Sequence, residues 1–378
     1  MRIVIVGGGI GGLAAGIALR RMGINAHVYE AANPIREIRA GVTLWPNAIR
    51  ALDWLGIGNP VREAAFGQSQ ASLRTPEGKL LLTLDYERLA RKFGESVVGI
   101  HRSDLRRILV RGFPRHALHL GATFTGFETT SHGIVAHLAS GKEIRADAVV
   151  GADGVRSPMR SRLSGRNPLK YAGYTAWQGA TDFNHLLADP GATWGRGMRF
   201  VRVPLSRGRV HWMATLNCKQ GERSPGGEKA ELLRLFKDWH DPIPSLIAAT
   251  PRTKIHRADA FFLDPLPTWG DGPATLLGDA AHPITPDLGM GICQVLEDVV
   301  VLAQSFKGNR DPASVFRKYE QARMPRTAAV SRMARRVARI GQREMSMAVM
   351  LRNWLVARIP GGTHLQPIEK ILEGDPLL

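Results

Sequence analysis

The sequence predicts an α/β protein in which a parallel sheet is interrupted by a β-rich region and followed by C-terminal helices. Residues 3–6 form an apolar run that leads into a glycine-rich turn and then a helix-forming run, 13–22, as at the start of a β–α–β unit. Two later apolar runs, 148–150 and 274–277, also lead into glycine-containing turns. Between them, several segments of 171–262 have the alternation and aromatic content of strands.

This pattern divides the chain into three parts. Residues 1–72, 98–170 and 263–330 are expected to form one discontinuous domain with a central parallel sheet. Residues 73–97 and 171–262 are expected to form a mixed β-sheet domain that binds the substrate, and 331–378 a helical segment.

Local signals place several elements. We expect a helix at 48–55 that ends at Gly56, a helix at 103–109 with Ser103 as its N-cap, and a helix at 229–239. A further helix begins near Ile292. The C-terminal segment predicts one helix from Ser331 to Arg358, because apolar residues recur there at near-helical spacing: Met333, Val337, Ile340, Met347, Leu351 and Trp354.

Composition limits the class of protein. The chain has 378 residues and a formal net charge of +18, but it has no zinc-finger spacing or Lys-rich tail, so nucleic acid is not expected as a partner. No apolar run approaches the roughly 18 residues of a membrane span, and residues 2–6 indicate a buried strand rather than a secretory signal. Cys218 and Cys293 lie far apart, which predicts neither a metal site nor a disulfide framework and fits the cytoplasm.

The first glycine motif is Gly7-x-Gly9-x-x-Gly12, which follows a strand and opens a helix. Its glycines permit a tight turn, close approach of the backbone to a pyrophosphate, and close packing of helix on strand. Glu30 ends the next strand, where an acidic residue accepts hydrogen bonds from adenosine ribose hydroxyls. The motif therefore predicts a bound dinucleotide without distinguishing FAD from NAD.

Two later motifs follow the other apolar runs. In Asp153-Gly154 the carboxylate could also cap the following helix and do no more. Asp279, after Gly278, is placed to accept from a sugar-chain hydroxyl. Pro286, Gly289 and Gly291 then stiffen a loop and let its backbone approach a flat ring, before a helix N-terminus that would stabilise negative charge.

Together the motifs resemble the FAD-dependent class A monooxygenases, the group of para-hydroxybenzoate, salicylate and urate hydroxylases and of zeaxanthin epoxidase. Further matches are Trp45-Pro46-Asn47, Arg102-x-Asp104-Leu105 and Glu297-Asp298. The resemblance implies a Rossmann-like, GR2-type domain with non-covalent FAD, reduction by NADH or NADPH, and transfer of oxygen from a flavin C4a-hydroperoxide to an aromatic or electron-rich small molecule. The implied cofactor-binding residues are Gly7, Gly9, Ile10, Gly11, Gly12, Glu30, Ala31, Thr43, Arg102, Asp153, Asp279, Pro286, Gly289, Met290, Gly291, Ile292 and Cys293.

Two positions depart from the family pattern. Arg39 stands where glycine is usual, and could crowd or contact the ribityl chain, while Met290 stands where Gln is common. By resemblance Asp153-Gly154 serves both FAD and NAD(P)H, Arg102 contacts the flavin side, and residues 289–293 border the isoalloxazine.

The resemblance also suggests catalytic residues. Asp287 is a candidate base for a phenol-like substrate, or else a loop carboxylate. Arg199 is a candidate contact for an anionic or carbonyl-bearing substrate, or else a solvated charge, and His211 replaces the Tyr of the urate enzymes. His282 is expected to be structural. Five aromatic residues are expected either to pack in the core or to line the substrate pocket: Trp177, Phe200, Trp212, Phe261 and Phe262.

Alternatives to ring hydroxylation remain open at this point. They are epoxidation of an isolated double bond, a flavin-dependent reductase or dehydrogenase, and a flavoprotein whose cofactor only shapes a binding surface. The protein is expected to be a monomer or homodimer that takes O2 and a small-molecule substrate and holds no metal. The Arg-rich C-terminal helix is expected to pack on the domain or to make a weak peripheral contact with anionic membrane.

Overall fold

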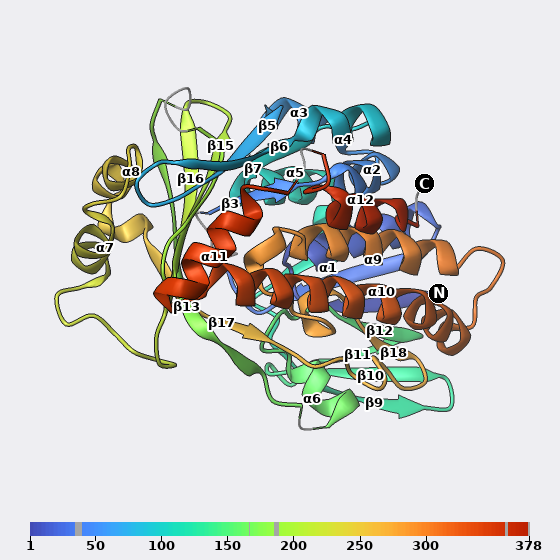
Figure 1. Cartoon of the computed structure of the whole chain (residues 1–378). Coiled ribbons are helices and arrows are strands. Elements are labelled where there is room, and N and C mark those ends of the chain that lie inside the picture. The colour runs from blue at the N-terminus through green and yellow to red at the C-terminus, as the bar shows by residue number, and fades with distance from the viewer. Residues whose placement is uncertain (35–39, 166, 185–188, 360–361, 377–378) are drawn as a thin grey trace.

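The computed structural model describes residues 1–34, 40–165, 167–184, 189–359 and 362–376 (Figure 1). Its first sheet is parallel throughout. Its strands, in spatial order, are β18 (Ala274–Leu276), β12 (Ala148–Gly151), β1 (Arg2–Val6), β2 (Asn25–Glu30) and β8 (Leu118–Leu120). The three apolar runs of the sequence are therefore adjacent strands, and the glycine-containing turns that follow them lie at one edge of the sheet.

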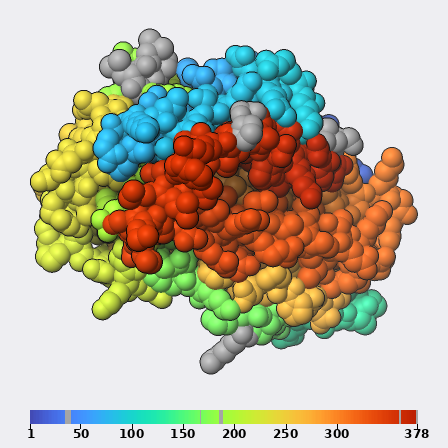
Figure 2. Space-filling view, viewed as in Figure 1, coloured from blue at the N-terminus to red at the C-terminus, as the bar shows by residue number. Residues whose placement is uncertain are grey.

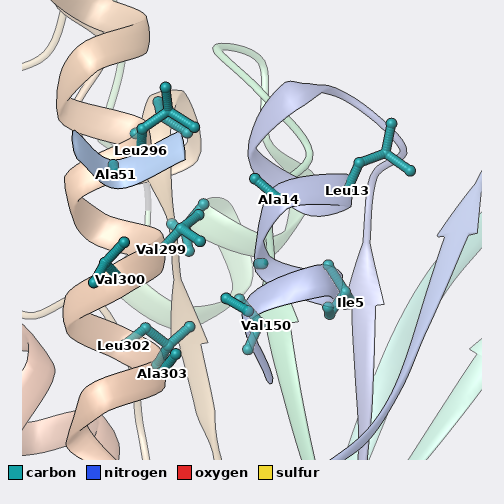
Figure 3. Close-up of a cluster of buried hydrophobic side chains, with 14 of the residues drawn as sticks. Ile5, Leu13, Ala14, Ala51, Val150, Leu296, Val299, Val300, Leu302 and Ala303 are labelled. Atoms are coloured by element: carbon teal, nitrogen blue, oxygen red, sulfur yellow. The ribbon is translucent and has the colours of Figure 1, made fainter. Parts of the chain in front are cut away.

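Helices α1 (Ile10–Arg21) and α9 (Gly291–Ser305) pack against each other beside this sheet. Figure 3 shows Ala14 of α1, Val299 of α9 and Val150 of β12 in one apolar cluster. The alanines on α1 are fully buried, and their small size permits this close approach. Helices α2 (Pro46–Trp54) and α10 (Pro312–Gly341) pack on α9, and the antiparallel strands β9 (Phe124–Thr130), β10 (Gly133–Leu138) and β11 (Glu143–Ala146) adjoin β1 and β12.

A second, seven-stranded sheet is antiparallel except where β14 pairs with β5. Its strands, in spatial order, are β17 (His256–Phe262), β13 (Lys170–Asp182), β16 (Arg209–Asn217), β15 (Met198–Leu205), β14 (Gly191–Trp194), β5 (Gln70–Arg74) and β6 (Leu80–Asp85). Strands from residues 70–85 therefore share one sheet with strands from residues 170–262.

One face of this sheet carries an aromatic core. Trp177, Phe200 and Trp212 are buried with Phe236 against helices α7 (Glu228–Phe236) and α8 (Ile243–Ala249). Phe200 stacks on Trp212, with ring centroids 5.5 Å apart. These side chains fill the layer between sheet and helices, so Trp177, Phe200 and Trp212 have the first of their two expected roles, packing in the core.

A three-stranded sheet connects the two larger ones. It consists of β3 (Gly41–Leu44), β7 (Val97–His101) and β4 (Phe66–Gln68), with α3 (Gly58–Ala64), α4 (Tyr86–Phe93) and α5 (Arg102–Gly112) around it. Helix α5 begins one residue earlier than expected, because His101 is its N-cap. The Ser103 amide donates to His101 Nδ1 at 3.3 Å, so Ser103 is not the cap.

The C-terminal helix is interrupted. Helix α10 ends at Gly341, and α11 (Ser346–Val356) starts in a new direction, followed by α12 (Gln366–Glu373) (Figure 1). One continuous helix from 331 to 358 is therefore wrong. The expected packing of the apolar stripe holds only for its first half, since Met347 is 81% and Trp354 52% exposed. No helix in the described part of the chain is long and apolar enough to cross a membrane.

Candidate functional site

A cavity of about 330 Å³ lies between the parallel sheet, the N-terminus of α9 and the seven-stranded sheet. One wall follows the carboxyl ends of β1, β12 and β18, where open α/β sheets bind ligands. The residues of this wall are Gly9, Ile10, Gly11, Ala152, Gly154, Leu277, Gly278 and Asp279. The opposite wall consists of Gln178, Val201, Val203, His211 and Met213.

The glycine motif is shaped by close contacts. Gly7 has a φ of +108°, which favours glycine. A Cβ on Gly12 would lie 1.9 Å from the Gly7 carbonyl oxygen, so this position also requires glycine. A Cβ on Gly9, in contrast, would meet nothing within 4 Å. Gly9 is also the N-cap of α1, with no side-chain cap, so the free N–H groups of this helix are available to an anion.

Glu30 and Ala31 lie outside the cavity wall. The Glu30 carboxylate accepts hydrogen bonds from the Gly8 amide at 2.6 Å and the Ala32 amide at 2.8 Å. These bonds fix the carboxylate beside the glycine turn. Each carboxylate oxygen can accept more than one hydrogen bond, so Glu30 retains capacity for ribose hydroxyls.

Arg102 and Asp279 line the cavity from two different elements. Burial raises the pKa of Asp279, and the nearby charge of Arg102 opposes this shift. Burial likewise lowers the pKa of Arg102, and Asp279 opposes that shift. Asp279 still has exposed surface, because it borders the cavity. The two groups thus place opposite charges near each other at the wall, with donors and an acceptor suited to a polar chain.

The segment that follows Asp153-Gly154 is hydrogen-bonded to the segment that follows Gly278-Asp279. Asp153 Oδ2 accepts from the Met159 amide at 3.0 Å, while Oδ1 is buried with no hydrogen-bond partner among the described residues. Arg160 donates to the Ala280 carbonyl at 3.0 Å and to the Val155 carbonyl at 2.8 Å. Asp153 lies behind the wall formed by its neighbours 152 and 154. Its unpartnered oxygen is a polar atom without a ligand.

The loop before α9 borders the cavity with Pro286, Gly289, Gly291 and Ile292. Gly289 has a φ of +63°. A Cβ on Gly291 would meet nothing within 4 Å, and α9 has no side-chain cap. The helix therefore presents free N–H groups to the cavity. Thr43, from β3, lies in the same wall.

Met290 and Cys293 are fully buried and lie outside the wall. Burial raises the pKa of the Cys293 thiol to about 12. Arg39, the other departure from the family pattern, lies outside the described residues. Within the described ranges, no group of three or more His, Cys, Asp or Glu side chains could hold a metal ion.

A buried charge network supports α9 from behind. Asp298 accepts from Arg323 Nε at 2.6 Å and contacts His282 Nε2 at 2.5 Å, and Glu297 pairs with Arg323 at 2.5 Å. Arg326 also pairs with Glu297, at 2.6 Å. His282 is outside the cavity wall. The partners from α10 were not identified from the sequence, because no local pattern marks Arg323 among the many arginines.

The sheet wall was also missed, apart from His211. Strand alternation places Gln178, Val201, Val203 and Met213 on the face opposite the aromatic core. The signal was present in the sequence, since each of these residues adjoins or lies three positions from a buried aromatic residue on the same strand. Their common face became evident only when the strands were paired.

His211 is held in one tautomer. Its Nδ1 lies 3.0 Å from the Gly179 carbonyl oxygen, which is only an acceptor, so Nδ1 carries the hydrogen and Nε2 is the acceptor of the ring. Burial lowers the pKa of His211 to about 4. The ring is therefore neutral at pH 7.

Asp287 and Arg199 meet, but outside the cavity wall. Asp287 Oδ1 pairs with Arg199, and Oδ2 accepts from the Tyr174 hydroxyl at 2.8 Å. Arg199 Nε donates to Gln342 Oε1 at 3.0 Å. Both charged side chains are almost completely buried. The network ties the loop before α9 to the sheet and to the end of α10.

The cavity fits the cofactor that the sequence motifs imply. Two uncapped helix N-termini face it, and at Gly9 and Gly291 the space a side chain would fill is left open. The unpartnered Asp153 oxygen lies behind the same wall. These features match a long, partly anionic ligand that runs from α1 to α9.

Comparisons with known proteins agree with this fit. A family model described as an FAD binding domain matches residues 1–334. The aurachin C monooxygenase/isomerase of Stigmatella aurantiaca is 35% identical over 358 residues, which cover 94% of this chain and 94% of that protein. The FAD-dependent urate hydroxylase of Klebsiella pneumoniae subsp. pneumoniae is 31% identical over 349 residues, covering 89% of each.

A solved structure is also similar over its full length. The crystal structure of Klebsiella pneumoniae HpxO complexed with FAD and uric acid has a TM-score of 0.94 and 28% sequence identity, and the match covers 100% of this chain and 98% of that one. The predicted fold, a Rossmann-like FAD-binding part with a mixed sheet and C-terminal helices, is confirmed by this likeness.

Proposed function

The chain belongs to the FAD-dependent class A flavoprotein monooxygenases, and on that premise we propose that it adds one oxygen atom from O2 to an uncharged aromatic ring, with NADH or NADPH as electron donor. The observation that carries the proposed substrate class is the sheet wall of the cavity, in which three apolar side chains accompany one amide and one neutral imidazole.

FAD supplies the redox chemistry that activates O2 when it is bound. The chain's own residues bind and orient it. The N-terminus of α1 holds the pyrophosphate, Glu30 accepts from the ribose, and Arg102 and Asp279 contact the chain that leads to the ring. The N-terminus of α9 stabilises negative charge on the ring.

The sheet wall favours an uncharged substrate. Val201, Val203 and Met213 offer apolar contact. Arg199, the nearest candidate for binding an anion, is paired with Asp287 outside the wall. Arg102 is in the wall, but in this proposal it contacts the cofactor chain near Asp279. A substrate carboxylate would therefore lose its hydration without gaining an unpaired cation, which is unfavourable.

His211 and Gln178 then orient the ring. Because Nδ1 of His211 donates to a backbone carbonyl, Nε2 accepts a hydrogen bond from a substrate hydroxyl or N–H. Accepting this hydrogen bond draws the proton partly away from the substrate without transferring it, because the lowered pKa makes the imidazole a weak base, and the aromatic ring becomes more electron-rich and so more reactive toward oxygen transfer. We propose His211 as the substrate contact that performs this step.

In this proposal Asp287 and Arg199 do not contact the substrate but hold the neighbouring loop in place. Burial raises the pKa of Tyr174 far above its usual range, so its hydroxyl stays protonated and donates to Asp287. This bond and the ion pair fix the 286–289 loop, which borders both the cofactor and the substrate space. Loss of either contact would loosen the loop and uncouple NAD(P)H oxidation from product formation.

The test uses matched substrates that differ by one charge. We expect 2-naphthol to stimulate NAD(P)H oxidation by the FAD-loaded enzyme and to yield a product with one ¹⁸O atom from ¹⁸O2, while its carboxylated analogue, 3-hydroxy-2-naphthoate, does neither. His211→Gln should raise KM for the naphthol. A preference for the carboxylate contradicts the substrate class, and turnover without O2 would indicate a reductase instead.

A further inference from the structure

Helix α11 presents its apolar face to solvent. Its residues Met347, Met350, Leu351, Trp354 and Leu355 follow the spacing of one helical face and are each at least half exposed. An amphipathic helix of a globular protein normally buries this face. The opposite side of α11 is the one held to the protein, where Arg352 is buried and donates to the Gly341 and Gly195 carbonyls.

The exposed apolar surface is concentrated there. Met345 and Ile359 at the two ends of α11 are exposed as well. Elsewhere in the described chain the large exposed apolar side chains are scattered singly: Met1, Leu80, Leu120 and Val155. Scattered residues need no explanation, whereas a contiguous patch marks an interaction site.

Arginines flank this patch. Residues 331–358 contain seven arginines and one acidic residue, Glu344. Arg332, Arg336 and Arg339 recur along one side of the end of α10, and Arg343 lies between α10 and α11. All four are exposed. Glu344 itself accepts from Asn217 at 2.6 Å. Figure 2 shows α11 and the end of α10 together on one face of the molecule.

We propose that α11 and the flanking arginines are the surface through which this protein docks on an anionic lipid bilayer. The combination is that of an interfacial helix, in which apolar side chains enter the headgroup boundary and basic side chains remain with the lipid phosphates. Met and Trp suit this boundary, since Met adapts its shape and Trp is amphipathic. The described helices cannot cross the bilayer, so the protein lies on it.

A second copy of the chain fits the same patch less well. Two copies related by a two-fold axis would bring the same patch of each copy together, and so gather the arginines of both copies at one interface. The apolar face of α11 also offers far fewer residues than the roughly 20–30 per side of a stable interface. An anionic bilayer instead neutralises the arginines. For this reason we propose a bilayer rather than a second copy of the chain.

Flotation of the FAD-loaded protein with vesicles tests the proposal. We expect binding to vesicles of equal parts phosphatidylglycerol and phosphatidylcholine, little binding to phosphatidylcholine alone, and release at high salt. Arg339→Glu should weaken binding roughly 30-fold, since it changes two units of charge. Leu351→Asp should weaken it about tenfold or more.

Two matched variants serve as controls. Lys142→Glu makes the same change of charge in the β10–β11 turn, and Leu120→Asp makes the same apolar change on β8; both should bind as the unmodified protein does. Equal binding to both kinds of vesicle, or no flotation, overturns the proposal. So does a concentration-dependent dimer in sedimentation that Leu351→Asp abolishes without any vesicle binding. Flavin absorbance of each variant reports that the cofactor site is intact.

Discussion

Replacing Arg323 by Met should destabilise the protein by about 3 kcal/mol. Arg323 is 1% exposed and forms ion pairs with Glu297 and Asp298, whose side chains are completely buried. Met has a similar length but no charge, so both carboxylates lose a partner inside the protein. Breaking a buried pair in this way costs 3–5 kcal/mol as a rule. We expect the lower end, because Arg326 still pairs with Glu297 and His282 with Asp298.

Urea unfolding of the FAD-loaded protein measures this cost, provided that the m-value is unchanged. Arg234→Met is the control, since Arg234 pairs with Glu231 within one helix at the surface and is 66% exposed, and this change should leave the free energy of unfolding nearly unchanged. Adding Asp298→Asn to Arg323→Met should restore part of the loss, because it removes a buried charge that has lost its arginine partner. An Arg323→Met protein as stable as the control would refute the reasoning.

Three further predictions follow. Burial lowers the pKa of His211 to about 4, so between pH 6.5 and 4 the folded protein binds fewer protons at this residue than the unfolded chain and loses stability as the pH falls. His211→Gln should make this loss smaller by up to about 3 kcal/mol. Urea titrations at each pH test this prediction. Gly9→Ala should fold but weaken FAD binding at least about tenfold, whereas Gly12→Ala should fail to fold, as circular dichroism and flavin titration will reveal. In the native protein Cys218 should react with a thiol reagent while Cys293 stays unmodified, and equal reactivity would contradict the burial of Cys293.

The sequence predicted the cofactor side of the site because its chemistry is local. Gly7 and Gly12 satisfy steric demands within one turn, Gly9 leaves open space beside it, and Asp279 closely follows the end of a strand. Such features can be identified without knowing what lies across the cavity. The three apolar runs also indicated a parallel sheet, since such strands are buried on both faces, but their order in it became known only from the structure.

Features that depend on distant pairing could not be predicted in the same way. The partner of Asp298 lies 25 residues further along the chain, on a helix rich in other arginines. The apolar stripe of α11 was visible in the sequence, but periodicity alone states only that a face exists. Whether that face is covered depends on how the break after Gly341 redirects the helix.

The sheet wall of the cavity shows this dependence on distant pairing most clearly, because strand register determines which residues it contains. Met213 is opposite Gln178 on one neighbouring strand and opposite Val201 on the other, which places all three in one row across the sheet. Trp212 and Phe200 occupy the alternate positions and point to the helices. A shift of one residue would exchange the two sets and replace the polar amide by indole rings. The proposed substrate class therefore depends on which of two adjacent residues faces the cavity, and composition alone leaves that choice open.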